Sequence, residues 1–412
     1  MAVSHGLIFF LDAFSAGLIS PVLSLVFLEH GATIETLALF VGIFSICVIL
    51  AEFPSGIAAD LKGRKNAFLL SHLLLAVNYL LQDFSKSPIL LAAACILFGV
   101  GKAFGSGSLE ALEVEQYIEK NGKSQLPAIN SAMEILECAG LAAGALTGGI
   151  LGSIGSRYRV ILRTLIVIEL LLVVLAIIFM EETRRPGKKI QFTSEIGQQI
   201  SSVKRLPGQS DVIGRILGIA CVIGCSQMIL EVYWQQNFLQ CLPENLERML
   251  GAVSCLGFAG SGIGSWLGSL MMKKVAKRSK LQAEYKWKKK KMYLYWLLRC
   301  FLPVTVMMLG LCRNWMLFVG TYLFIYIVLG SGNLWERTLL HENVENQYRA
   351  SMLSVYSLFI RGGGVAASGL ASVIMTFWGL NLVWILCPGV GLAAMLLIFT
   401  RPQKERRDYL HT

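Results

Sequence analysis

The sequence predicts an all-α membrane protein in which twelve transmembrane helices form two pseudo-symmetric halves of six. The composition is the first observation: 55% of the 412 residues are hydrophobic and only 15% are charged, whereas soluble chains carry about 25% charged residues. The second is that apolar runs of about 20 residues, the length that spans a bilayer, recur along the whole chain. The third is a longer polar stretch, from Glu182 to Gln209, that separates six such runs from six more.

The boundaries of the spans follow from turn signals and from the loops that hold the charged residues. The first half is predicted to cover residues 1–181, the linker 182–209 and the second half 210–412. Two parallel repeats related by an axis along the membrane normal are a known membrane architecture. The predicted spans are 6–29, 34–60, 66–84, 88–114, 127–151, 159–181, 211–239, 246–272, 291–312, 315–337, 349–376 and 380–400.

Lys and Arg lie mostly on one side of the predicted membrane. The loop between spans two and three, the loops on its side, the linker and the C-terminal tail hold 27 of the 37 basic residues, and the opposite loops hold 5. Because cytoplasmic loops carry an excess of Lys and Arg, we expect a multi-pass protein of the cell membrane with both termini in the cytoplasm. This distribution accounts for the net charge of +11 without a nucleic-acid partner.

Two further observations limit the class of protein. The first apolar run begins near Gly6 without a basic leader, so we interpret it as a membrane helix rather than a cleavable signal peptide. The ten cysteines have no CxxC spacing and lie mostly in apolar runs, which favours small buried side chains over disulfides or zinc. The five histidines occur singly, so we expect no metal site.

The most informative segment is Gly56-Ile-Ala-Ala-Asp60-Leu-Lys-Gly63-Arg64-Lys65, a short loop between spans two and three. Gly56 permits a close approach of two helices, and Asp60 lies at a helix end where the positive N-terminus of another helix can meet it. Gly63 permits a tight turn, and Arg64 and Lys65 favour an anionic cytoplasmic leaflet. The alternative is a basic turn that only sets the topology.

This loop resembles the loop 2–3 signature of the major facilitator superfamily, and shorter strings resemble its bacterial twelve-span drug-efflux branch of drug–proton antiporters. The resemblance implies two halves that rock around a midplane site, with Asp60 capping span eleven and pairing with Arg349 as a gating latch. The strings that carry the resemblance are Glu52-Phe-Pro-Ser-Gly56, Ser106-Gly-Ser-Leu-Glu110-Ala, Tyr233-Trp-Gln-Gln and Arg349-Ala-Ser-Met-Leu-Ser354.

Span five contains a row of small residues at helical spacing. Gly140, Gly144, Gly148 and Gly149 match the glycines of the family's antiporter motif, and Ala145 stands where that motif has proline. We expect this face to let spans five and eight pack tightly. Generic packing of small residues is an equal alternative to an antiporter role.

Charged residues inside the spans indicate mechanism, because an uncompensated charge at the bilayer centre costs about 2.5–3.5 kcal/mol. The resemblance implies that spans one, four, seven and ten line the cavity, which selects Asp12, Lys102 and Glu110 for proton coupling. The apolar setting of Asp12 favours its protonated form. Fixed ion pairs are the alternative, and we interpret Glu169 with Arg163 as one. The charged residues in the spans include Asp12, Glu52, Lys102, Glu110, Glu134, Glu137, Arg163, Glu169, Arg215, Glu231, Arg299 and Arg361.

Acidic and aromatic residues on the later cavity spans suit an amphipathic, cationic organic molecule. Aromatic residues that face lipid or the core are the alternative. The candidates for the substrate cavity are Glu231, Tyr233, Trp234, Tyr326 and Trp335.

These expectations combine into a secondary active transporter that exports a small amphipathic, drug-like or antibiotic-like compound in exchange for protons. We expect a small-molecule substrate, a lipid bilayer as surroundings, a functional monomer and no cofactor, with the proton gradient as the energy source. The alternatives are a symporter or exporter of a nutrient, siderophore or peptide-derived metabolite, and a transport-inactive sensor or scaffold. An enzyme is not expected, because the sequence has no recognisable set of nucleophile and base.

Overall fold

The computed structural model describes residues 3–121, 126–154, 158–181, 211–243, 246–279, 284–344 and 349–400, and these form helices without any strand. Eleven helices in this part of the chain are long and apolar enough to cross a membrane, or twelve when one bent pair counts as a span. The twelve-span, all-α prediction is confirmed. The linker at 182–209 and the tail after residue 400 lie outside the described residues.

In the described residues of the N-terminal half, eight helices make six spans. They are α1 (Val3–Ile19), α2 (Leu23–Glu29), α3 (Leu37–Lys62), α4 (Arg64–Phe84), α5 (Pro88–Gly105), α6 (Ser108–Asn121), α7 (Leu126–Gly152) and α8 (Arg159–Phe179). The C-terminal half has one helix per span. They are α10 (Asp211–Cys241), α11 (Met249–Ser279), α12 (Glu284–Leu311), α13 (Trp315–Asn343), α14 (Arg349–Trp378) and α15 (Leu380–Thr400).

Two spans of the N-terminal half are interrupted, which the sequence-based boundaries miss. The first span bends by 55° between α1 and α2, at a segment that contains Pro21, and proline ends a helix because it lacks the amide hydrogen. The fourth span breaks between α5 and α6, where Gly107 has φ +68°, a conformation that glycine adopts without strain.

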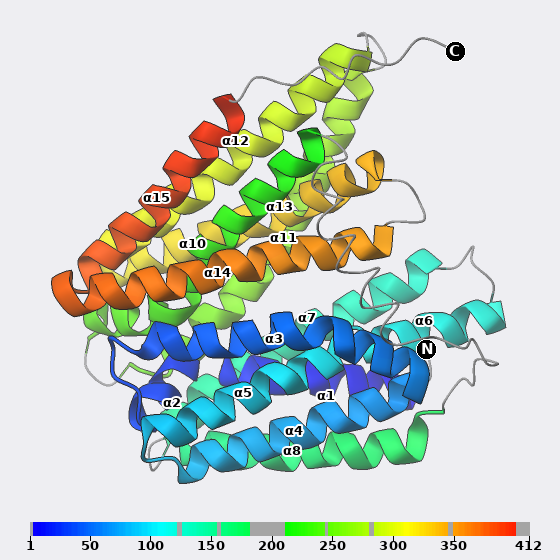
Figure 1. Cartoon of the computed structure of the whole chain (residues 1–412), viewed down its shortest axis with the longest axis vertical. Coiled ribbons are helices and arrows are strands. Elements are labelled where there is room, and N and C mark those ends of the chain that lie inside the picture. Colours follow the sequence, from blue (N-terminus) through cyan, green and yellow to red (C-terminus); the bar gives the residue numbers. More distant parts are fainter. Residues whose placement is uncertain are drawn as a thin grey trace.

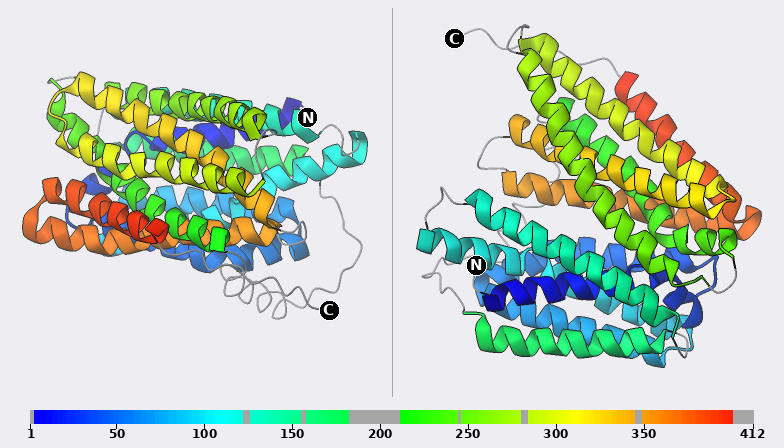
Figure 2. Two further views of the ribbon diagram at one scale, coloured as in Figure 1. Left: turned by 90° about the horizontal axis from the view of Figure 1, so that it is seen from above. Right: turned by 180° about the vertical axis from the view of Figure 1, so that it is seen from behind.

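The two halves are separate bundles that contact each other at one end (Figure 1). At that end the Gln235 side chain donates to the Ser20 carbonyl at 3.2 Å, and Ser372 donates to the Glu35 carbonyl at 2.7 Å. The α7–α11 and α3–α14 pairs form the faces between the halves. At the other end, where α3 ends and α14 begins, the bundles diverge, as the right-hand view in Figure 2 also shows. We call these the closed end and the open end.

The apolar cores follow the same division. One cluster of buried side chains lies wholly within the N-terminal half, and includes Ile8, Phe68 and Leu165. The larger cluster fills the C-terminal half and continues into α2 and the start of α3 through Phe27 and Phe40. The larger cluster thus joins the two halves at the closed end.

Candidate functional site

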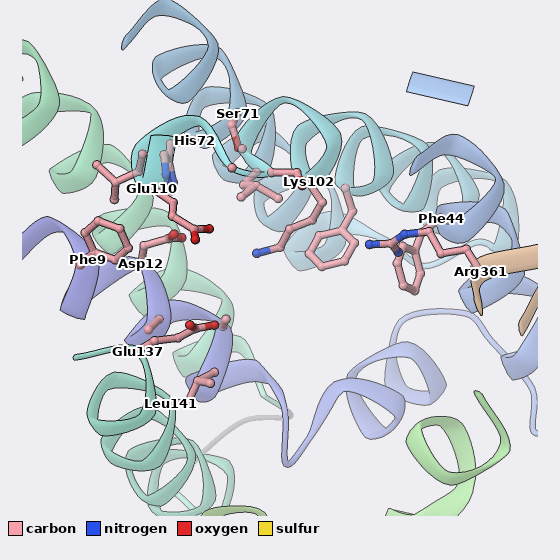
Figure 3. A pocket seen from close by; sticks show the side chains of 18 residues that line it. Phe9, Asp12, Phe44, Ser71, His72, Lys102, Glu110, Glu137, Leu141 and Arg361 are labelled. Carbon is pink, nitrogen blue, oxygen red and sulfur yellow. The ribbon is translucent and has the colours of Figure 1, made fainter. Parts of the chain in front are cut away.

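A cavity of about 460 Å³ lies between the two halves. Its wall comes from α1, α3, α4, α5, α6 and α7 of the N-terminal half, and Arg361 of α14 contributes from the C-terminal half (Figure 3). Phe9, Phe44 and Phe98 supply apolar surface to it. The volume falls in the range of small-molecule sites, and the mixed lining suits a molecule with apolar and polar parts.

Three carboxylates lie on one side of this cavity: Asp12 of α1, Glu110 of α6 and Glu137 of α7. Figure 3 shows the Asp12 and Glu110 carboxylates close to each other, with Glu137 directed into the same space. Lys102 of α5 also lines the cavity, with its ammonium 5.7 Å from the Phe98 ring centre, a cation–π distance. The structure therefore brings together Asp12, Lys102 and Glu110, the three residues selected for proton coupling.

Local sequence explains how these side chains reach the cavity. The break at Gly105–Gly107 starts a new helix, and Glu110 lies in its first turn, where the positive helix end favours a carboxylate. Glu137 lies three residues before Gly140, on the helix that packs against α1. Glu137 is one of the charged residues in the predicted spans, but the resemblance does not select it for proton coupling, because span five is not among the implied cavity helices.

His72 of α4 lines the same cavity and was missed by sequence reasoning. Its Nδ1 lies 2.5 Å from a carboxylate oxygen of Glu169 on α8, and both side chains are buried. The expected pair of Glu169 with Arg163 is wrong, since Arg163 donates to Asp83 at 3.2 Å. Glu169 follows Arg163 by six positions, which places the two side chains about 120° apart around the helix.

Arg361 connects the cavity to the opposite half. Its charge attracts Glu52 of α3 and Glu231 of α10, and Glu52 also interacts with Ser357 of α14. Glu231 is exposed but does not line the described cavity. Glu231 is therefore close to the basic group of the site without belonging to its wall.

The aromatic residues expected in the substrate cavity lie mostly elsewhere. Tyr233, Trp234 and Trp335 are each at most 3% exposed and pack in the core of the C-terminal half. Trp234 stacks near Tyr322 with ring centres 4.9 Å apart, and Tyr326 continues this row, half-buried. Contrary to expectation, these aromatic side chains do not line the described cavity in this conformation. Their large apolar surfaces are used in helix packing instead.

The loop between α3 and α4 forms the turn that its glycine indicates, with Gly63 at φ +100°. Asp60 is 42% exposed and lies 3.6 Å from Arg64. Lys65 donates to the carbonyls of Ile177 and Met180 at the end of α8, so it anchors the loop to span six.

For two other residues of the expected gating group, Gly56 and Arg349, the structure does not show the expected contacts. A Cβ atom at Gly56 would meet nothing within 4 Å, so the expected close helix approach is absent in this conformation. Arg349 begins α14, but its side chain lies outside the described residues, so the Asp60–Arg349 latch stays a prediction.

The glycines of span five pack as the motif suggests, but mainly against a different helix. Cβ atoms at Gly140, Gly144 and Gly148 would overlap backbone atoms of α1, whereas one at Gly149 would lie 2.6 Å from Gly251 of α11. The expected contact of spans five and eight thus involves Gly149, and the other three glycines serve spans five and one. The spacing of four keeps the three on one face.

The described residues contain no group of three or more His, Cys, Asp or Glu side chains placed to hold a metal ion. The cavity's own groups can bind protons through carboxylates and imidazole, and they can attract charged molecules.

Comparison with known proteins agrees with this architecture. The nucleoside transporter NupG superposes with a TM-score of 0.72 and 13% identity, covering 97% of this chain and 99% of that one. A POT family transporter in complex with 5-aminolevulinic acid gives 0.70 and 12%, covering 96% and 94%. A bacterial homologue of the human lysosomal transporter Spinster, in an inward-facing and unoccupied conformation, gives 0.68 and 13%, covering 96% and 94%.

These likenesses are at identities that show the fold alone. A search among curated proteins found no match. The sequence itself matches the family model described as Major Facilitator Superfamily over residues 6–335. The chain therefore belongs to the major facilitator superfamily.

Proposed function

We propose that this protein is a proton-coupled secondary transporter that exports a small amphipathic cation by alternating access. The observation that carries the proposal is the grouping of Asp12, Glu110 and Glu137 in one cavity between the halves. When all three carboxylates are ionised, they outnumber the two cations Lys102 and Arg361, and the cavity wall carries a net negative charge. A cationic molecule and a proton compete for that charge, which is the basis of exchange.

The charge distribution predicts which side of the membrane the open end faces. The open end is the end where α3 joins α4, which holds the basic loop of Arg64 and Lys65. The excess of Lys and Arg in the loops on that side predicts that it faces the cytoplasm. The cavity would then receive its substrate from the cytoplasm, and rocking of the halves would expose it outside.

Lys102 and Arg361 support a second candidate function. Two cations on the cavity wall favour an anionic group, so a zwitterionic or nucleoside-derived nutrient or metabolite is the alternative substrate. The similar structures include proteins described as a nucleoside transporter and a peptide transporter. The two candidates differ in the charge of the molecule that moves.

Transport by purified protein in proteoliposomes with an imposed pH gradient tests both candidates. The probes are ethidium as an amphipathic cation, uridine as a nucleoside and dialanine as a zwitterion. We expect ethidium to be driven against its concentration gradient, and only when protons flow the opposite way. Uphill movement of uridine or dialanine with no movement of ethidium would favour the second candidate, and transport that ignores the pH gradient would contradict proton coupling.

Two variants on one helix sharpen this test. Glu137→Gln removes a cavity carboxylate, whereas Glu134→Gln removes an exposed carboxylate one turn earlier on α7 that does not line the cavity. Glu137→Gln is expected to weaken ethidium transport about tenfold, the effect of losing one favourable charge contact of about 1.4 kcal/mol. Glu134→Gln should behave as wild type. Asp12→Asn should still bind ethidium but lose the dependence on the pH gradient.

A further inference from the structure

The N-terminal half contains two buried pairs of histidine and glutamate. His72 of α4 contacts Glu169 of α8, with exposed fractions of 2% and 0%. His5 of α1 contacts Glu113 of α6, with exposed fractions of 7% and 3%, and its Nε2 lies 2.9 Å from the Phe179 carbonyl. The pairs are alike in composition and burial, but only His72 lines the cavity.

The geometry makes His72 the link between the cavity and Glu169. The Nδ1 atom of His72 is bound to one Glu169 oxygen, Oε2, which leaves Nε2 as the nitrogen able to take up another proton. The other oxygen of Glu169, Oε1, is buried without a hydrogen-bond partner. Glu169 itself does not line the cavity, so His72 is the member of the pair that a proton from the cavity reaches.

The charge of this pair depends on one proton. With a hydrogen on Nδ1 alone, neutral His72 donates to ionised Glu169, and the pair carries one negative charge. A hydronium ion in the cavity can give its proton to Nε2, which forms one N–H bond and leaves a water molecule. The pair is then neutral, as imidazolium and carboxylate, and release of the proton is the reverse step.

The neighbouring groups do not supply the missing positive charge. Three carboxylates and two cations face the cavity around His72, so its surroundings are already net negative. Glu113 contacts its own histidine, and Asp83 is neutralised by two arginines. The charged and titratable groups on the surrounding helices are Asp12, Lys102, Glu110, Glu137, Arg361 and Glu169, with Tyr79 on α4 itself.

We infer that His72 and Glu169 form a proton-binding site that must be loaded before the open end closes in the absence of substrate. Water in the open cavity can solvate the edge of the pair. When the halves close, that water leaves, and an uncompensated charge on a buried pair becomes costly. The inference rests on the proposed proton coupling, and it adds a second site to that of Asp12.

The experiment measures closure of the open end without any transported molecule. Spin labels at Leu61 of α3 and Lys274 of α11, both exposed near the open end, report the distance between the halves in purified protein on a cysteine-free background. In wild type the ratio of closed to open molecules should rise as the pH falls. One linked proton changes that ratio by about tenfold per pH unit over the titration range.

Glu169→Gln removes the negative charge that the proton compensates. When the logarithm of the ratio of closed to open molecules is plotted against pH, we expect the steepness of the plot to fall by one in this variant. The variant should also close at alkaline pH, where wild type stays open. The matched control is Glu113→Gln, which disrupts the pair that does not line the cavity and should keep the wild-type slope. A wild-type ratio that ignores pH, equal slopes for Glu169→Gln and wild type, or the same loss in Glu113→Gln would each overturn the inference.

A second variant keeps the test decisive if Glu169→Gln does not fold. His72→Gln leaves Glu169 to take up the proton alone, and a carboxyl group binds protons less tightly than imidazole in water. The pH at which the open end closes should then fall by more than one unit in His72→Gln, whereas His5→Gln should leave this pH unchanged. An unchanged closing pH in His72→Gln contradicts the site. Transport insensitive to a pH gradient would contradict the proposed function, whereas unchanged closure here contradicts only this proton site.

Discussion

Gly144 of α7 lies directly against Phe14 of α1, so that a Cβ atom added to Gly144 would overlap the Phe14 carbonyl oxygen. Gly140 and Gly148 make equivalent contacts one turn on either side, with Phe10 and Leu18. Close backbone approach through small residues replaces the hydrophobic effect as a driving force between helices in lipid. This contact fixes the position of α1, and with it the position of Asp12 on the cavity wall.

The first expectation concerns the strength of that contact. Gly144→Ala should destabilise the protein by about 1–3 kcal/mol, the usual cost of overpacking, because backbone atoms have to move. Gly262→Ala on α11 is the control, since a Cβ there would meet nothing within 4 Å. Thermal unfolding of both variants in detergent measures the difference. Equal midpoints would show that α1 and α7 are not held by this contact.

The sequence was sufficient for the fold because its signals are local. The length of each apolar run and the glycine at the turn before α4 depend on neighbouring residues, and Gly63 adopts the expected positive φ. Asp12, Lys102 and Glu110 lie on one cavity wall, as the family resemblance implied for their helices, and their role in proton coupling stays a prediction. These parts of the prediction needed no knowledge of which side chains meet across the bundle.

The remaining features depend on contacts between distant segments. His72 and Glu169 are 97 residues apart, and nothing in either local pattern indicates the other. The fourth span breaks at Gly107, shortly before Glu110, and a glycine inside an apolar run does not show whether a span will break there. Trp335 was assigned to the cavity from its helix alone, although the face of that helix determines whether it is buried.

The second expectation concerns a buried ion pair in the C-terminal half. Arg299 of α12 and Glu336 of α13 contact each other with 0% exposure, and Tyr295 and Tyr356 donate their hydroxyls to Glu336. Glu336→Gln should destabilise the protein by about 3–5 kcal/mol, because it leaves Arg299 buried without a counter-charge. Arg299→Met combined with Glu336→Leu should recover most of that loss.

The control for this pair is Glu342→Gln. Glu342 pairs with Lys291 and is 49% exposed, so its loss should change stability by less than about 1 kcal/mol. Chemical denaturation in detergent measures both variants. A Glu336→Gln protein as stable as Glu342→Gln would mean that Arg299 finds another partner when Glu336 is neutral.

The third expectation concerns the closed end. Ser24 of α2 and Gln236 of α10 share a hydrogen bond of 2.8 Å across the halves. Ser24→Ala should weaken closure there by about 0.5–1.5 kcal/mol, which shifts the ratio of conformations by two- to tenfold. Spin labels at Ile154 and Leu246, exposed near this end, would report the shift as a larger population of long distances.

The control for the closed end is Thr147→Ala. The Thr147 hydroxyl donates to a carbonyl of its own helix, at Ala143, so its removal breaks no contact between the halves. An equal shift in Thr147→Ala and Ser24→Ala would indicate a general loosening of the bundle rather than loss of one latch contact.

The last expectation concerns Asp60 and the open end. Its contact with Arg64 is long and exposed, so Asp60→Asn should change stability by less than about 1 kcal/mol and leave membrane abundance near that of wild type. The proposed partner is the start of α14 in the conformation with a closed open end, where a helix terminus contributes up to about 2 kcal/mol. Losing this contact should reduce ethidium transport at least tenfold, because the closed conformation becomes rarer.

Asp211→Asn is the matched control, since Asp211 forms a similar exposed pair with Arg215 four residues away. Arg349→Gln should reproduce the defect of Asp60→Asn. Normal transport by Asp60→Asn, or an equal loss in Asp211→Asn, would assign Asp60 to the surface of the loop and not to its gating.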